Sequence, residues 1–157
     1  MPFLNYKPPK TLRLLFIIHY APLLLIITVG PQSVIFNFMT LRNDPLLCII
    51  FGLIIFLLGS FMYFKWEWFW HKTYHGQLVT TGIFQYIRHP HYTSLLIIGY
   101  GLGLFFNSIP ALIIATIAIP IMMISIFDEE RYLIKQYGQD YQNFMKKTPW
   151  RMIPKIF

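Results

Sequence analysis

The feature that most constrains this chain is a long stretch without charge. From His89 to Phe127 there is no Asp, Glu, Lys or Arg, and the apolar sequence is interrupted near its middle by Asn107-Ser108 and the nearby Pro110. Soluble domains carry charges on about a quarter of their residues. We therefore interpret this stretch as two apolar helices joined by a tight turn and buried in lipid.

The composition of the whole chain agrees with a membrane protein. Of its 157 residues, 56% are hydrophobic and 12% are charged, and its length suits a single domain, residues 1–157. The net charge of +7 has no Lys/Arg cluster with interleaved aromatic residues, so we expect no nucleic-acid partner and instead a lipid bilayer. The single cysteine, Cys48, lies in an apolar run. Because a disulfide needs two cysteines, none can form within one chain.

The apolar residues fall into four segments. Roughly 20 apolar residues cross a bilayer core, and all but the third segment have that length. Basic residues precede the first segment, as in a signal peptide, but it has no clear cleavage site and more segments follow. The sequence thus predicts an all-α integral membrane protein with about four transmembrane helices and a tight third/fourth hairpin, at residues 11–29, 46–64, 92–106 and 109–127.

Positive charges predict the orientation. Four spans place the N-terminus, the loop 65–91 and the C-terminal tail on one side, and these regions hold every Lys and Arg except Arg42. Loops rich in Lys and Arg face the cytoplasm. We therefore expect both termini on the cytoplasmic side, with the aromatic loop KWEWFWHKTYHG at the membrane interface.

The tail also has a helical pattern. Apolar side chains recur at helical spacing with polar residues between them, at Leu133, Tyr137, Tyr141 and Phe144. This spacing predicts a C-terminal amphipathic helix that lies along the membrane surface.

Nearly all the unusual polar residues lie on the predicted cytoplasmic side. One group is Asp128-Glu129-Glu130, after the fourth apolar segment. A helix C-terminus disfavours acidic residues, so one interpretation is a new interfacial helix that begins at Asp128 and is capped by it. The other is that the carboxylates face a cationic or polyhydroxyl ligand.

A second group is the block Arg88-His89-Pro90-His91-Tyr92. Pro90 suits the first turn of a helix, and Arg88 and His89 could simply anchor that helix at the lipid headgroups. Alternatively, the free N–H groups at the helix start form an anion site that His89 and Tyr92 complete.

Histidines and glycines are less specific. His71 and His75 have i, i+4 spacing, but the histidines are too few and too irregular for a di-iron site, so we expect no metal. Gly99, Gly101 and Gly103 lie in an apolar segment with no preceding strand, which favours close helix packing over a dinucleotide site.

As a set, these motifs resemble a known family. LVTTGIFQYIRHPHY, an apolar hairpin, EERYLIKQYGQDYQNF and WRMIP together resemble the isoprenylcysteine carboxyl methyltransferase family and, more distantly, the phospholipid N-methyltransferases. The resemblance covers about residues 76–154. It implies an integral membrane methyltransferase that uses S-adenosylmethionine, facing the cytoplasm, with a lipophilic small-molecule or lipidated acceptor.

The resemblance also assigns roles to residues. Arg88 becomes the candidate catalytic residue, which orients an anionic acceptor or the carboxylate of the methyl donor. The cofactor-binding candidates are Gln77, Leu78, Val79, Phe84, His89, Pro90, His91, Tyr92, Glu129 and Glu130. In chemical terms, the helix start suits the carboxylate of the donor, the glutamates its ammonium or ribose, and aromatic faces its sulfonium.

Two positions depart from the family pattern. Phe84 stands where a tyrosine is typical, and Ser125 stands where eukaryotic members carry an arginine for the substrate carboxylate. A carboxylate, a lipid amine and a thiol therefore all stay open as acceptors. Two other functions also stay open: a membrane NADPH-dependent reductase of the sterol type, and a non-catalytic helical scaffold whose basic tail binds anionic lipid or a protein.

Overall fold

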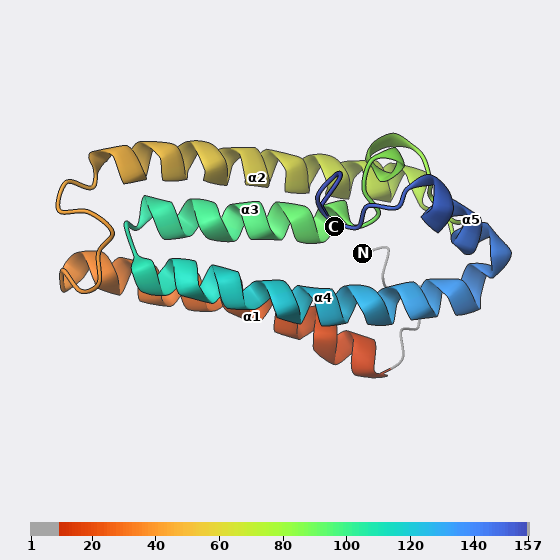
Figure 1. Cartoon of the computed structure of the whole chain (residues 1–157), viewed down its shortest axis with the longest axis horizontal. Helices are drawn as coiled ribbons and strands as arrows, with labels where there is room; N and C mark the ends of the chain where they lie inside the picture. Colours follow the sequence, from red (N-terminus) through yellow and green to blue (C-terminus); the bar gives the residue numbers. More distant parts are fainter. Residues whose placement is uncertain (1–9, 157) are drawn as a thin grey trace.

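The computed structural model describes residues 10–156, with side chains from Tyr20 onward, and this part of the chain is all-helical. The predicted all-α class is confirmed. Figure 1 shows the long helices side by side in alternating directions, with α5 and the C-terminal tail at the end of the molecule where α2 and α4 finish. The helices are α1 (Lys10–Ile35), α2 (Leu46–Thr73), α3 (Pro90–Phe105), α4 (Ile109–Tyr137) and α5 (Gln139–Lys147).

Two helices are long and apolar enough to cross a membrane. Among the described residues these are α2 and α4, with 28 and 29 residues. At 1.5 Å per residue each is about 42–44 Å long, so each exceeds a hydrocarbon core of about 30 Å by roughly two turns. The 16 residues of α3 reach only about 24 Å. We call the ends of α2 and α4 that extend beyond such a core the overhangs. The polar residues of the site lie on or beside them.

These overhangs correct two predictions. The aromatic sequence from Lys65 to Thr73 is the end of α2 and not a loop, so the connection to α3 is limited to residues 74–89. Likewise α4 runs unbroken through Asp128, so no capped helix begins there. In both cases the apolar run marks only the part of the helix that suits lipid, and the helix continues beyond it.

Glycines set the packing of α3. Its most extensive contacts are with α2, while α1 packs mainly on α4. A Cβ atom built on Gly101 would lie 2.5 Å from the backbone nitrogen of Phe56 in α2, and one on Gly52 would lie 2.1 Å from that of Phe105. The predicted close helix approach is thus confirmed for Gly101. Gly99 has room for a methyl group, because its nearest neighbours would be 3.5 Å away.

The turn between α3 and α4 is held by the α1–α2 connection. The Asn107 side chain accepts a hydrogen bond from the backbone N–H of Arg42 at 3.2 Å and donates one to the backbone carbonyl of Arg42 at 2.8 Å. The buried hydroxyls of Ser33 and Ser108 lie 2.7 Å apart, and Ser108 also caps α4 by accepting from the N–H of Ala111 at 3.2 Å. Both helices therefore leave this turn at a fixed angle.

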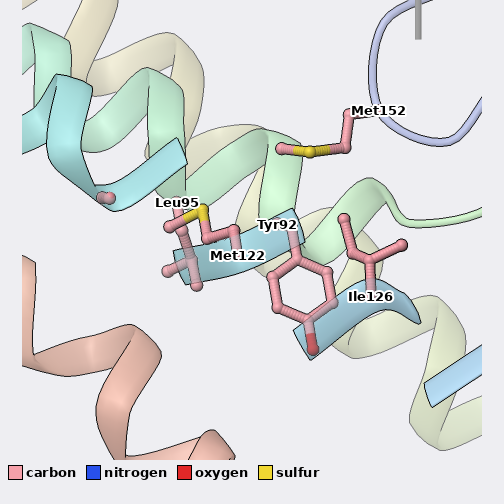
Figure 2. Close-up of a cluster of buried hydrophobic side chains, with 6 residues drawn as sticks. Tyr92, Leu95, Met122, Ile126 and Met152 are labelled. Atoms are coloured by element: carbon pink, nitrogen blue, oxygen red, sulfur yellow. The ribbon is translucent and has the colours of Figure 1, made fainter. Parts of the chain in front are cut away.

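Two buried clusters lie toward the other end. Figure 2 shows the first, in which Met152 of the tail joins side chains of α3 and α4: Tyr92, Leu95, Met122 and Ile126. In the second, Tyr141 and Phe144 of α5 pack on Trp66, Val79 and Phe84. The single amphipathic helix predicted for the tail is thus wrong: Leu133 and Tyr137 belong to the end of α4, Tyr141 and Phe144 belong to α5, and all four pack in this cluster.

Candidate functional site

The centre of the site is a buried ion pair between Arg88 and Glu130. Arg88 precedes α3 and Glu130 lies in the overhang of α4, and both are about 95% buried. The Arg88 Nε and Nη2 atoms donate to Glu130 Oε1 at 2.9 and 2.6 Å, and Nη1 donates to the carbonyl of Thr148 at 2.6 Å. Every guanidinium nitrogen of Arg88 thus has a protein partner, so Glu130 and Thr148 fix the position of its side chain.

His89 lies between two carboxylates. Its Nε2 atom is 3.3 Å from Glu130 Oε1 and its Nδ1 atom is 3.6 Å from Glu129 Oε2. The Tyr92 hydroxyl hydrogen-bonds to Glu129 as well. The two glutamates differ in access, because the side chain of Glu129 is 36% exposed and that of Glu130 is 5% exposed.

The C-terminal tail completes this cluster. Arg151 Nε donates to both oxygens of Glu130, at 3.2 and 3.1 Å, and its Nη2 atom is 3.1 Å from Oε2. Its guanidinium also lies over the ring of Phe127, 5.0 Å from the centroid. Sequence reasoning missed Arg151, although its tail motif WRMIP was noted. A useful signal was the adjacent pair of acidic residues, since buried carboxylates need nearby cations.

His91 lies among aromatic rings, and Pro90 precedes it at the start of α3. The His91 Nε2 atom is 3.1 Å from the hydroxyl of Tyr20, and its ring centroid is 4.5 Å from that of Trp66. Pro90 begins α3, as its position in the sequence predicted. Both residues are buried, and they follow Arg88 and His89 directly in the sequence.

The remaining predicted residues lie apart from the ion cluster. Val79 and Phe84 are buried in the hydrophobic cluster under α5, and Leu78 packs against it. The exposed Gln77 donates to the carbonyl of Thr73 at 2.8 Å and accepts from the N–H of His75 at 2.9 Å. In this arrangement Gln77 stabilises the turn after α2, and its cofactor contact stays a prediction.

The residues fit a ligand with the chemistry of S-adenosylmethionine. Glu129 offers a partly exposed carboxylate for an ammonium or for ribose hydroxyls, and nearby aromatic faces suit a sulfonium. The indole N–H groups of Trp66 and Trp70 are buried without a hydrogen-bond partner among the described residues. Buried donors are nearly always satisfied in native proteins, so these two are available to a bound ligand.

The electrostatics of His89 lead to a pH prediction. Burial disfavours its charged form, but the hydrogen bonds and negative charges of Glu129 and Glu130 outweigh burial and raise the pKa of His89 above its ordinary value. The folded protein therefore holds a proton on His89 more tightly than the unfolded chain does. The stability that this proton contributes is fully present below about pH 6.5, the ordinary pKa of histidine, and is lost as the pH rises through the folded-state pKa. In detergent, the midpoint temperature of thermal unfolding should fall as the pH rises from about 6.5 through the folded-state pKa of His89. His89→Gln should remove that slope, and an unchanged slope would contradict the assignment.

Comparisons with known proteins place the chain in a family. A family model described as phospholipid methyltransferase matches residues 43–140. The protein-S-isoprenylcysteine O-methyltransferase of Schizosaccharomyces pombe is 33% identical over 73 residues, which is 46% of this chain and 31% of that protein. The protein-S-isoprenylcysteine O-methyltransferase B of Arabidopsis thaliana is 33% identical over 76 residues, or 48% of this chain and 39% of that protein.

The matched part is therefore well under half the length of either relative. No solved structure matches the chain. The family model covers the whole of α2, α3 and α4, and with them the block around Arg88 and both glutamates. The resemblance found in the sequence is thus confirmed: the chain belongs to the phospholipid methyltransferase family and is similar to isoprenylcysteine O-methyltransferases.

Proposed function

We propose that this chain is a membrane methyltransferase that transfers the methyl group of S-adenosylmethionine to a lipophilic acceptor. One observation carries the proposal: in a chain of this family, the Arg88–Glu130 pair buries one glutamate and leaves its neighbour Glu129 partly exposed. Glu130 is paired with two arginines, so we assign it to the structure, and we assign the more accessible Glu129, beside the buried His89, to ligand binding.

Each part of the donor has a partner of suitable chemistry. Glu129 binds the ammonium or the ribose, while His89 and the start of α3 lie toward the carboxylate. The ring of Tyr92, whose centroid is 5.9 Å from that of His89, is an aromatic face that suits the sulfonium. Arg88 acts in this scheme as a positioning residue, because it holds Glu130 and, through it, His89.

The reaction itself needs little from the protein beyond placement. The acceptor nucleophile forms a bond to the methyl carbon as the carbon–sulfur bond breaks, and the electron pair leaves with sulfur. A sulfonium is already a good leaving group, so catalysis comes from alignment in a water-poor pocket. Any proton released by the acceptor passes to a base or to water.

The acceptor is lipophilic and arrives from the bilayer. We propose four spans, with the site on the cytoplasmic side and lateral entry of the acceptor between helices. The relatives are named for a prenylated cysteine. Here Ser125, which is buried and donates to the carbonyl of Ile121 at 3.2 Å, takes the place of a carboxylate-binding arginine. A lipid amine or a thiol is therefore as suitable an acceptor as a carboxylate.

The test is calorimetric titration of S-adenosylmethionine into detergent-solubilised protein, with NADPH titrated in parallel. We expect micromolar binding of the methyl donor and none of NADPH. Transfer of a labelled methyl group to a prenylcysteine, a lipid amine and a lipophilic thiol then identifies the acceptor class. Binding of NADPH alone would favour a reductase, and binding of neither ligand would favour a scaffold.

A further inference from the structure

The tail that follows α5 lies outside the residues matched by the family model, which end at 140. It nevertheless runs along the block that begins α3. The backbone N–H of Arg88 donates to the carbonyl of Trp150 at 3.0 Å, and that of His89 donates to the carbonyl of Arg151 at 2.8 Å. The tail thus fixes the backbone of both residues before their side chains are considered.

Side chains strengthen this attachment at both ends of the tail. The buried Thr148 accepts from Arg88 through its carbonyl and donates from its hydroxyl to the carbonyl of Gln85 at 3.3 Å. Thr93 in the first turn of α3 donates to the carbonyl of Met152 at 2.9 Å. The Met152 side chain is 3% exposed and enters the cluster around Tyr92 (Figure 2).

Arg151 is the residue of this tail that reaches the ion cluster. Glu130 Oε1 accepts from Arg88 and lies near His89, whereas the partner given to Oε2 among the described residues is Arg151. Two arginines therefore share one buried carboxylate. His89 contacts this carboxylate through Nε2 at 3.3 Å, and its Nδ1 atom lies 3.6 Å from Glu129, the accessible glutamate.

We propose that Arg151 is a positioning residue of the cofactor site, which holds Glu130 with Arg88 so that His89 and Glu129 present a fixed pair of groups to the methyl donor. This inference rests on the proposed function. It adds a residue from outside the matched region, and it makes the C-terminal tail a part of the site.

The charges around His89 provide a readout that a merely structural residue would not move. Glu129 and Glu130 of α4 favour its protonated form, while Arg88 and Arg151 disfavour it; Tyr92 is the polar neighbour on α3. Removing the positive charge of Arg151 should therefore raise the pKa of His89 further. Histidine titration followed by NMR on the unliganded protein measures this directly.

The test compares Arg151→Gln and Arg151→Lys with Arg131→Gln. Arg131 is 78% exposed and pairs with Asp128 at 3.3 Å, so its substitution removes the same charge from the same end of the molecule without touching the cluster. Arg151→Gln should weaken binding of S-adenosylmethionine by about tenfold or more, because a buried acceptor loses its partner. Arg151→Lys keeps the charge but loses the two-point contact, so its affinity for S-adenosylmethionine should lie between those of Arg151→Gln and Arg131→Gln.

The outcomes separate the two proposals. A wild-type protein that binds no S-adenosylmethionine overturns the proposed function and this inference with it. Wild-type binding with an unchanged dissociation constant and unchanged His89 titration in Arg151→Gln overturns the inference alone. Loss of the folded protein in both Arg151 variants would make Arg151 a stability residue and would also overturn it.

Discussion

Glu130→Ala should destabilise the protein by about 3–5 kcal/mol, the cost of removing one partner from a buried ion pair. The reason is the charge that remains. Arg88 is 5% exposed and its Nε and Nη2 atoms both donate to Glu130, so the substitution leaves a guanidinium buried without its counter-ion. Arg151 loses the same partner but is 26% exposed, so it can turn toward water.

Glu129→Ala is the matched variant for this test. It makes the same chemical change one residue earlier on the same helix, but the Glu129 side chain is 36% exposed and its charged neighbour is His89. We expect only a small loss of stability and a loss of S-adenosylmethionine binding. We therefore expect Glu130 to be required for stability and Glu129 to be required for binding.

Thermal and chemical unfolding in detergent, with calorimetric titration of the methyl donor, measures both effects. Equal destabilisation by the two variants would contradict the division between a buried and an accessible glutamate. So would a Glu130→Ala protein that is as stable as the wild type. Glu130→Gln is informative as well, because it keeps the volume and one acceptor while it removes the charge.

The sequence predicts the starts of these helices better than their ends. The apolar segment that begins at Leu46 and the Asn107-Ser108-Pro110 break predict the starts of α2 and α4 to the residue. The predicted ends of the first, second and fourth helices come too early, because an apolar run reports the length suited to lipid and not the length of the helix, whereas the predicted end of α3 differs from the observed one by a single residue. Thr73 and Tyr137 lie well beyond the last strongly apolar turn.

The sequence predicts some members of the buried ion cluster but not their pairing. Arg88 and the two glutamates stand out because charges are rare in this chain and these flank its longest uncharged stretch. Their contact joins residues 42 positions apart and depends on how α3 packs against α4, which periodicity in one sequence does not specify. The same holds for Arg151, whose contacts come from the path of an irregular tail.

Gly101→Ala should destabilise the protein by about 1–3 kcal/mol or more, the usual cost of overpacking a tight contact. The added methyl group would lie 2.5 Å from the backbone nitrogen of Phe56 and 2.7 Å from its Cα. These are backbone atoms of α2, so no side chain can move away to make room. The methyl group therefore forces α2 and α3 apart. The other end of α3 begins at Pro90, inside the block Arg88–Tyr92, so this separation can also reach the site.

Gly99→Ala is the control two residues away on the same helix. Its methyl group would meet Ile26, Ala115 and Leu23 at 3.5–3.6 Å, which is ordinary van der Waals contact. It should be neutral or slightly stabilising, since alanine is the better helix former. The comparison thus removes helix propensity as an explanation and isolates the α2–α3 distance. Equal unfolding midpoints for the two variants would show that this distance is not fixed by glycine. A lower midpoint for Gly101→Ala alone, with weaker binding of S-adenosylmethionine, would mean that the α2–α3 contact also positions the site.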